Sequence, residues 1–589
     1  MQLPEQYAAA EELERFLGDP SNPEEVLSFK RAVELDEREA YPEDACTLLN
    51  RWGCNKFLVP VARGGKLASY EELYALIRTV SRRDMTVGTT YLMNYIASCP
   101  VWVAGSPEQQ RTLAELIENG DQVAIGLHEK EHGNDLLACE VEATEVANGY
   151  RLAGEKWVIG NPKRGTVLII YARTAKAGGP RGFSLFLLDK RNLPAFFYSY
   201  LPKFKTHGVR GHEMGGIRFH DCIVPDDAVV GGLGAGLEIA LKSSQITRTL
   251  VTATCLGAAD TALRATLDFA LARNLYGRTV FDIPHARSTL TDAFLDLLIG
   301  SCLATSTTRS LHVVPEQMSV IAAVIKYLVP TAIDQLMRNV SVVLGARNYL
   351  REGHWWGIFQ KLVRDTPIAS VGHYSSVINL SHLAPQLQQL AKHRATVTAL
   401  EEERRLRLEK IFCLTAPLPA FESQQLLVNG RGRDDILQGL ESAVSQLQSL
   451  TAVADVDLEV LERIIALTEE AVAAMKLDEQ TLAGCVAQYG RSFHGSPEHF
   501  ELARRYCLLH AAAACFHLWV HNRQQLGDFF ARGEWLVLAL DKLLTNLRSQ
   551  TIPLQHRYRE NMAHELLRLY REDLLFSIVP LQLALKEKR

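Results

Sequence analysis

The chain has 589 residues, of which 47% are hydrophobic and 22% charged, as in ordinary globular enzymes. This length suffices for three or four packed domains, and the formal net charge of -5 excludes a general attraction to nucleic acid. Eleven cysteines occur without a C-x-x-C pair, so we expect no zinc site, no other metal site and no disulfide framework, and we expect a reducing, cytoplasmic location.

Neither a secretion signal nor a membrane span is expected. The N-terminal stretch MQLPEQYAAAEELERFL is acidic and amphipathic, whereas a secretion signal is basic and then apolar. No stretch reaches the roughly 18 consecutive apolar residues of a membrane helix. Residues 507–520, CLLHAAAACFHLWV, come nearest and contain two histidines, so we interpret them as a buried helix.

Residues 1–120 predict an N-terminal helical domain, because the stretch 70–98 has apolar residues at helical spacing. Ser106 is the expected N-cap of a helix that begins at Pro107, and Gly120 is its expected stop.

Residues 121–229 predict a middle domain built on an antiparallel sheet. Short β-rich segments are separated by Gly, Pro, Asn or Lys, among them QVAIGLHE, YRLAGEKWVIG, TVLIIYART, FSLFLLDK and GGIRFHDCIVP.

Residues 230–395 return to long helices, whose small residues allow the close contacts of a four-helix bundle. Residues 396–589 continue with helical periodicity through a Pro- and Gly-punctuated joint, TAPLPAFESQQLLVNGRGRDD. The predicted fold is therefore mainly α with a central antiparallel β domain and a helical C-terminal extension.

Two stretches in the β domain are candidates for ligand contact. GLHEKEHGND (126–135) is a glycine-bearing turn in which Glu129 and Asp135 could shape a loop that presents backbone N–H groups to a ligand. GEKWVIGN (154–161) is a strand that carries Trp157. Taken alone, the first also fits a plain structural loop and the second a core tryptophan.

Three further candidates lie in the helical region. In RNLYGRTVFDIPH (273–285), Arg273 and Arg278 could hold phosphate through charge-assisted hydrogen bonds, although exposed arginines are common at helix ends. The other two are LGARNYLREGHWWGIFQKLVRD (344–365) and IASVGHYSSVI (368–378).

In order and spacing, these stretches resemble the acyl-CoA dehydrogenase family over about residues 20–390. KFKTHGVRGHEMGGIRFHDCIVPDDAVVG (203–231) is similar to the family's closing β segment, and LVRD (362–365) to the Arg-Asp pair before its catalytic segment. The long helix and its end match at four positions, Arg248, Gly257, Arg273 and Gly277. The resemblance implies a helical domain, a β domain and a four-helix domain that enclose FAD, in a homodimer or homotetramer.

The resemblance also implies the reaction, an α,β-dehydrogenation of an acyl group carried by CoA or by acyl-carrier protein. A Glu removes the α-proton and the flavin takes the β-hydride; an electron-transfer flavoprotein or oxygen then takes the electrons. The family Glu lies eight residues after the Asp of the Arg-Asp pair and is followed by Gly-Thr; this chain has His373 there, followed by Tyr374. The family's second base position, just before Arg248, is Thr247. Both positions lack a carboxylate.

The implied flavin site departs from the family as well. His128 stands where the signature has Ser or Thr, and Val158 and Gly160 stand where a Trp and a Thr flank the flavin ring. The turn that touches FAD through the neighbouring subunit begins here at Gly345. The residues implied to bind the cofactor are His128, Glu129, Asp135, Trp157, Gly160, Arg273, Tyr276 and Gly345. Those implied at the substrate are Thr247, Arg248 and Tyr374.

His373 admits three interpretations. It is the base, since neutral imidazole with a pKa near 6.5 is competent at pH 7; it orients a different substrate in a flavin monooxygenase of the same fold; or it is structural in a non-catalytic homologue that acts in assembly. We take the FAD-dependent dehydrogenase as the leading hypothesis. The extension resembles the helical addition of very-long-chain members, and an interface role is expected because it shows no strongly basic amphipathic face.

Overall fold

The computed structural model describes residues 5–351, 354–372, 374–396, 401–448, 456–548 and 556–585. The chain begins with a helical domain of α1 (Ala8–Leu17), α2 (Phe29–Glu37), α3 (Glu43–Trp52), α4 (Tyr70–Arg83), α5 (Met85–Ala104) and α6 (Pro107–Glu118). The predicted cap of α6 is confirmed: Ser106 Oγ accepts from the Gln109 N–H, and the Gln109 side chain accepts from the Ser106 N–H. Gly120, at φ +89°, follows the end of the helix.

The middle domain is a sheet of β1 (Gln122–Gly126), β2 (Glu142–Val146), β3 (Gly149–Gly160), β4 (Gly165–Arg173), β5 (Phe183–Asp189), β6 (Tyr198–Leu201), β7 (Met214–Val224) and β8 (Val229–Val230). The strand order is β6-β7-β3-β2-β4-β5-β8, with β1 beside β4. Unlike the purely antiparallel sheet predicted, it is mixed, because β1 pairs with β4 in parallel. The chain leaves β1 through a long loop and the β2–β3 hairpin before it returns as β4, which allows this pairing.

The third unit is a helical bundle of α7 (Gly236–Ala272), α8 (Pro284–Val313), α9 (Met318–Leu344), α10 (His354–Asp365), α11 (Ile368–Val371), α12 (Ser376–Leu383) and α13 (Leu387–Thr396). A hairpin of β9 (Asn274–Leu275) and β10 (Arg278–Thr279) separates α7 from α8. Helix α7 crosses α4 so closely that a Cβ at Gly257 would lie 2.5 Å from the carbonyl oxygen of Arg78. Glycine is therefore required at this crossing.

One segment, Pro315–Tyr349, which contains α9, is long and apolar enough to cross a membrane, with a mean hydropathy of 1.5 in its most apolar window. The sequence prediction of no such segment missed it, because single polar residues interrupt the apolar run. Two thirds of that window is buried inside the protein, as in the core helix of a bundle.

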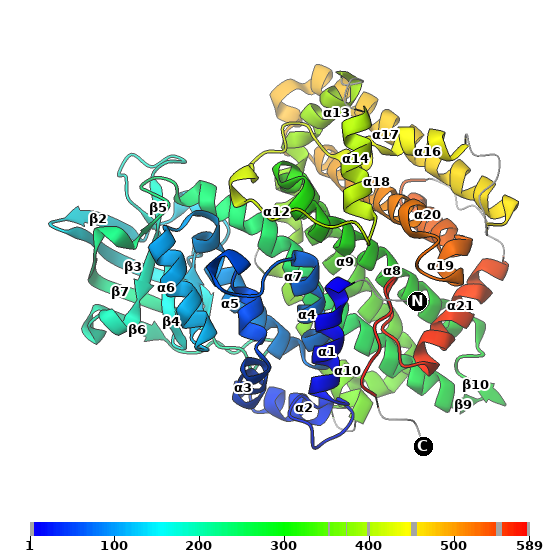
Figure 1. Cartoon of the computed structure of the whole chain (residues 1–589), viewed down its shortest axis with the longest axis horizontal. Coiled ribbons are helices and arrows are strands. Elements are labelled where there is room, and N and C mark those ends of the chain that lie inside the picture. The colour runs from blue at the N-terminus through cyan, green and yellow to red at the C-terminus, as the bar shows by residue number, and fades with distance from the viewer. Residues whose placement is uncertain are drawn as a thin grey trace.

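The extension adds α14 (Glu401–Phe412), α15 (Asp435–Gln438), α16 (Leu440–Gln448), α17 (Leu458–Tyr489), α18 (Pro497–Asn522), α19 (Asp528–Arg532), α20 (Glu534–Thr545) and α21 (His556–Arg571). Helix α18 lies at its centre and packs against α8 and α9 of the bundle (Figure 1). Its stretch 507–520 is buried almost throughout, so the predicted buried helix is confirmed. The extension thus covers one face of the bundle.

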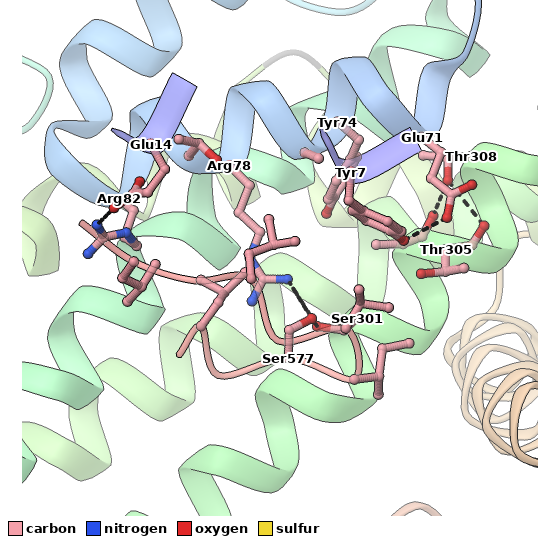
Figure 2. Close-up of a pocket in the computed structure, with 18 residues that line it drawn as sticks. Tyr7, Glu14, Glu71, Tyr74, Arg78, Arg82, Ser301, Thr305, Thr308 and Ser577 are labelled. Carbon is pink, nitrogen blue, oxygen red and sulfur yellow. Dashed lines mark hydrogen bonds and ion pairs between the residues drawn. The ribbon is translucent and has the colours of Figure 1, made fainter. Parts of the chain in front are cut away.

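The C-terminal segment returns from the extension to the N-terminal domain. Arg78 of α4 reaches it and donates hydrogen bonds to Ser577 Oγ (3.3 Å), to the carbonyl of Phe576 (3.2 Å) and to Ser301 Oγ of α8 (3.1 Å) (Figure 2). The cavity between these groups measures about 40 Å³, which holds a few water molecules at most. Arg78 therefore fastens the chain end to the core and does not mark a ligand site.

Candidate active site

A cavity of about 300 Å³ lies where the sheet meets α5 and α7. Most of its wall is apolar and the polar groups are few, as in sites for small planar ligands. The wall comes from α5 (Thr89, Leu92, Met93, Ile96), β1 and the following loop (Ile125, Leu127, His128, Glu129, Lys130, Gly133, Asn134), β3 (Trp157, Val158, Ile159, Gly160), the segment before β7 and its start (Val209, His212, Met214), α7 (Val251, Thr254) and α11 with its end (Ile368, Val371, Gly372). The cavity is thus shared by all three domains.

A buried ion pair holds the loop that follows β1. Lys156 of β3 is fully buried, and its Nζ donates to Glu129 Oε1 at 2.7 Å and to the carbonyl of Leu127 at 3.2 Å. Burial by itself would raise the pKa of Glu129, but the Lys156 charge and hydrogen bonds from Cys139 Sγ and the Glu140 N–H outweigh it and lower the pKa to about 2. Glu129 is therefore a charged anchor of the cavity wall.

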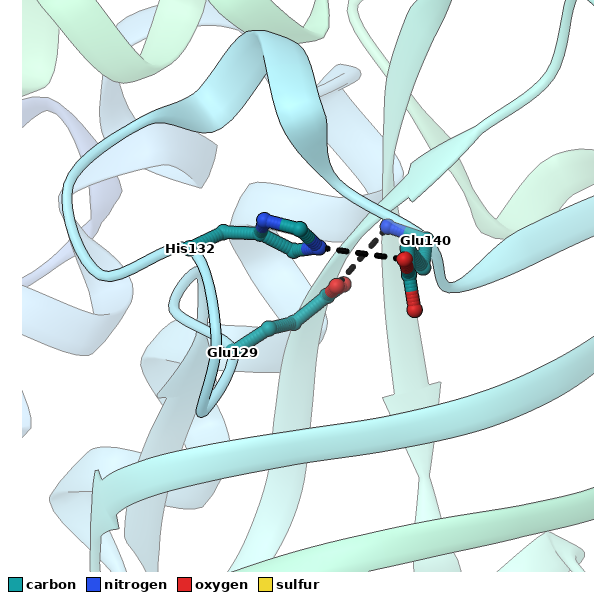
Figure 3. Close-up of side chains that lie close together, drawn as sticks. All are labelled: Glu129, His132 and Glu140. Atoms are coloured by element: carbon teal, nitrogen blue, oxygen red, sulfur yellow. Dashed lines mark hydrogen bonds and ion pairs between the residues drawn. The ribbon is translucent and has the colours of Figure 1, made fainter.

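The same carboxylate belongs to a group of three side chains with the spacing of metal ligands, Glu129, His132 and Glu140 (Figure 3). Glu129 Oε2 accepts from the Glu140 N–H at 2.7 Å, and His132 Nε2 lies 3.2 Å from Glu140 Oε1. Both oxygens of Glu129 already accept hydrogen bonds, Oε1 from the Lys156 ammonium and Oε2 from the Glu140 N–H. We therefore interpret the three side chains as contacts that hold the loop after β1 in place.

Among the described residues, His128 and His212 line the cavity, and both are neutral at pH 7. Burial, with the nearby Lys156 charge, lowers the pKa of His128 to about 4 although Asn134 hydrogen-bonds to its ring. Burial and the charge of Lys203 lower the pKa of His212 to about 4. The sequence indicated His128 but gave no reason to select His212.

Position 373 follows the cavity wall directly. His373 itself lies outside the described residues, but both of its neighbours are fixed. Lys326 of α9 is fully buried, and its Nζ donates to the carbonyls of Ala369 and Gly372, the latter at 3.2 Å. Burial lowers the pKa of Lys326 to about 7. On the other side Tyr374 is buried at φ +64°, the left-handed region that favours glycine.

Of the three residues predicted to bind substrate, Arg248 and Tyr374 pack against each other. The Arg248 guanidinium lies 4.6 Å from the centre of the Tyr374 ring and donates to Ser244 Oγ at 2.7 Å and Asn379 Oδ1 at 3.4 Å. Thr247 Oγ1 donates to the carbonyl of Ser244. Burial lowers the pKa of Arg248 to about 10. None of the three lines the cavity described above.

The Arg-Asp pair before this segment is structural. Asp365 is buried; it accepts from Lys361 Nζ at 2.6 Å and from the N–H of Val209 at 2.6 Å, and Val209 is part of the cavity wall. Arg364 donates to Asp36 of α2 at 2.6 Å. The pair therefore ties α10 to the N-terminal domain and to the loop beside the cavity.

Of the residues predicted at the cofactor, His128, Glu129, Trp157 and Gly160 line the cavity, and four others lie apart from it. Asp135 is exposed and caps the short turn Leu136–Ala138. Arg273 and the 93%-exposed Tyr276 lie at the β9–β10 hairpin, across the molecule from the sheet (Figure 1), and Gly345 follows α9 at φ +59°. Within one chain the structure does not bring these four to the cavity.

Comparison with known proteins identifies the family of this chain. Family models for the N-terminal, middle and C-terminal domains of acyl-CoA dehydrogenase match residues 4–120, 124–222 and 234–387. These matches cover more than half of the chain, so the chain belongs to the acyl-CoA dehydrogenase family. The predicted family and fold class are confirmed; the residues after 387 lie outside all three matches.

Individual relatives are distant. The probable acyl-CoA dehydrogenase fadE25 of Mycobacterium leprae is 28% identical over 262 residues, which are 44% of this chain and 67% of that protein. The butyryl-CoA dehydrogenase structure from Megasphaera elsdenii has a TM-score of 0.58 at 21% identity and covers 64% of this chain and 97% of its own. The prolyl acyl carrier protein oxidase AnaB has a TM-score of 0.55 at 18% identity, with coverages of 60% and 95%.

Sequence reasoning missed three side chains that the structure places at the site, Lys156, His212 and Lys326. A signal existed for one of the two lysines: Lys326 is a single charge after the apolar stretch SVIAAVI, whereas Lys156 directly follows Glu155. Such a lysine is either exposed or paired, and the sequence alone does not distinguish the two.

Proposed function

We propose that the protein is an FAD-dependent dehydrogenase of acyl thioesters, with the 300 Å³ cavity as the site of the flavin ring. The observation that carries the proposal is the composition of the wall: Trp157 and Gly160 of β3 on one side, and Gly372, directly before position 373, on the other. The wall fits a planar aromatic ring, because it is mostly apolar and its two imidazoles are neutral. Bound FAD would supply the hydride acceptor.

The chain's own residues provide orientation and a dry site. The apolar wall excludes water from the reacting carbons, which strengthens every electrostatic interaction there. Lys326 fixes the carbonyl of Gly372 and thereby the start of the segment that presents position 373. We assign removal of the α-proton to the imidazole of His373. This assignment rests on the family resemblance, because position 373 is one of the two family base positions and neither carries a carboxylate here.

The substrate is, in this proposal, a small acyl group on CoA or on acyl-carrier protein. One observation supports a small group: Tyr374 packs on Arg248 where the family sequence has a glycine. An electron-transfer flavoprotein or oxygen accepts the electrons; reoxidation of the reduced protein in air distinguishes them.

We further propose a homodimer or homotetramer in a cytoplasmic location. The oligomer is supported by the exposure of Tyr276 and Arg273, which the family resemblance assigns to cofactor contacts; light scattering of the purified protein tests it. The location is supported by eleven free cysteines, and cell fractionation tests it.

The decisive experiment is the visible spectrum of the purified full chain, followed by anaerobic titration with a panel of acyl-CoAs. A yellow protein whose spectrum bleaches with an acyl-CoA supports the proposal. Colourless protein that takes up no FAD would favour an assembly protein, and turnover only with NAD(P)H and oxygen would favour a monooxygenase. His373→Ala is expected to slow bleaching at least a hundredfold, whereas His207→Ala, at an exposed position, leaves it unchanged; equal rates in both would exclude His373 as the base.

A further inference from the structure

At the end of β3, the His212 imidazole occupies the space that a side chain at position 160 would need. A Cβ added at Gly160 would lie 2.7 Å from His212 Nε2 and 3.1 Å from Met93 Cε, and the first distance is shorter than real Cβ contacts. The φ of Gly160 is not positive, so the backbone would accept other residues. The imidazole, and not the backbone, therefore keeps position 160 a glycine.

The hydrogen bonds of His212 define its tautomer. His212 is 1% exposed, and its Nδ1 lies 3.0 Å from Thr90 Oγ1. The Thr90 hydroxyl donates its proton to the carbonyl of Thr86 at 2.8 Å, so Nδ1 must carry the hydrogen of the neutral ring. Nε2 is then a bare acceptor.

This acceptor has no partner within the described chain. His212 Nε2 forms no hydrogen bond, and neither does Thr89 Oγ1 on the adjacent wall. Both residues line the cavity. Buried polar atoms are normally paired, so two unpaired atoms on one wall point to a partner that the ligand supplies.

We propose that His212 is a cofactor-contacting residue whose neutral Nε2 accepts a hydrogen bond from an N–H of the ring bound in the cavity, in the space that a side chain at position 160 would otherwise fill. This inference rests on the proposed flavin site. The proposed contact comes from His212, in the segment before β7. Strand β3 cannot make it, because it ends in Gly160, which has no side chain.

The test is a double-variant cycle on FAD binding, measured by titrating FAD into the flavin-depleted full chain. His212→Ala is expected to weaken FAD about fivefold to tenfold through loss of one hydrogen bond and to shift the visible spectrum. Gly160→Thr is expected to weaken it at least tenfold through the clash. The combination Gly160→Thr/His212→Ala should bind FAD about as well as His212→Ala alone, because the threonine then occupies the vacated space and only the hydrogen bond is lost.

The control is His220→Ala, an exposed histidine on β7 that hydrogen-bonds to Ser199, which should leave affinity and spectrum unchanged. Additive losses in the combined variant, or wild-type affinity and spectrum in His212→Ala, would overturn the inference while the flavin site stands. A wild-type chain that binds no FAD would instead overturn the flavin site together with this contact.

Discussion

Replacing Lys156 by methionine tests whether the buried ion pair holds the cavity wall. The substitution keeps the length of the side chain but leaves the Glu129 carboxylate, which is buried, without its cation. At about 1.4 kcal/mol per pKa unit, the lowering of the Glu129 pKa from 4.5 to about 2 corresponds to about 3 kcal/mol. That figure is the net of burial, the Lys156 charge and the hydrogen bonds of Cys139 and Glu140. Removing one partner of a buried pair costs about 3–5 kcal/mol, and we expect a loss of this size.

The assay is guanidinium unfolding followed by tryptophan fluorescence, with hydrogen exchange of residues 127–141 as a local probe. The matched control is Lys156→Met/Glu129→Gln, which removes both charges. Its amide oxygen can still accept from one of the two N–H groups, Glu140 or Val141, that bond to different oxygens of Glu129 in wild type. We expect the double variant to lose only about 1–2 kcal/mol. A single variant that loses less than about 1 kcal/mol, or a double variant no more stable than the single, would refute the reasoning.

The pH dependence has a defined sign. The folded pKa of Glu129 is lower than its ordinary value, so the pair's contribution is fully present above about pH 4.5 and is lost as the pH falls toward 2. The difference in unfolding free energy between wild type and Lys156→Met should therefore shrink as the pH falls below 4.5.

Three further predictions concern the other buried groups. Arg78→Met removes three hydrogen bonds to the C-terminal segment and Ser301, so we expect the unfolding free energy to fall by about 2–4 kcal/mol. We also expect trypsin to cleave faster at Arg571. Lys326→Met should abolish a rise in unfolding free energy between about pH 7 and 10.5, because the folded pKa of Lys326 is lowered to about 7 and the unfolded chain binds the proton in that range. Tyr374→Gly removes the phenol ring and relieves the left-handed backbone, so acyl-CoAs longer than butyryl-CoA should bleach the flavin at least tenfold faster relative to butyryl-CoA.

Each of these has a contradicting result. Equal tryptic cleavage in Arg78→Met and in the exposed control Arg38→Met would show that the arginine does not fasten the chain end. An identical pH profile for wild type and Lys326→Met would contradict the lowered pKa of Lys326. Tyr374→Phe should keep the wild-type chain-length preference, and a shift in that variant as large as in Tyr374→Gly would argue against a steric role of the ring.

The sequence by itself determined the helix–sheet–helix order, because that order depends on local periodicity and on caps such as Ser106. The order and spacing of its motifs indicated the family through their resemblance to known members. The family resemblance placed His128, Glu129, Trp157 and Gly160 at one site, and all four line the cavity. The parallel β1–β4 pairing could not be predicted, since it depends on contacts between distant segments.

The tertiary structure decided which polar groups are paired. Lys156 of β3 meets Glu129 of the loop after β1. His212, before β7, meets Gly160 at the end of β3, and Lys326 of α9 reaches Gly372 after α11. Charge, tautomer and pKa of these side chains depend on burial and on the partners that folding brings within hydrogen-bonding distance. Residue type and spacing determine neither burial nor these partners. The two lysines and His212 could therefore be identified as parts of the site only from the folded chain.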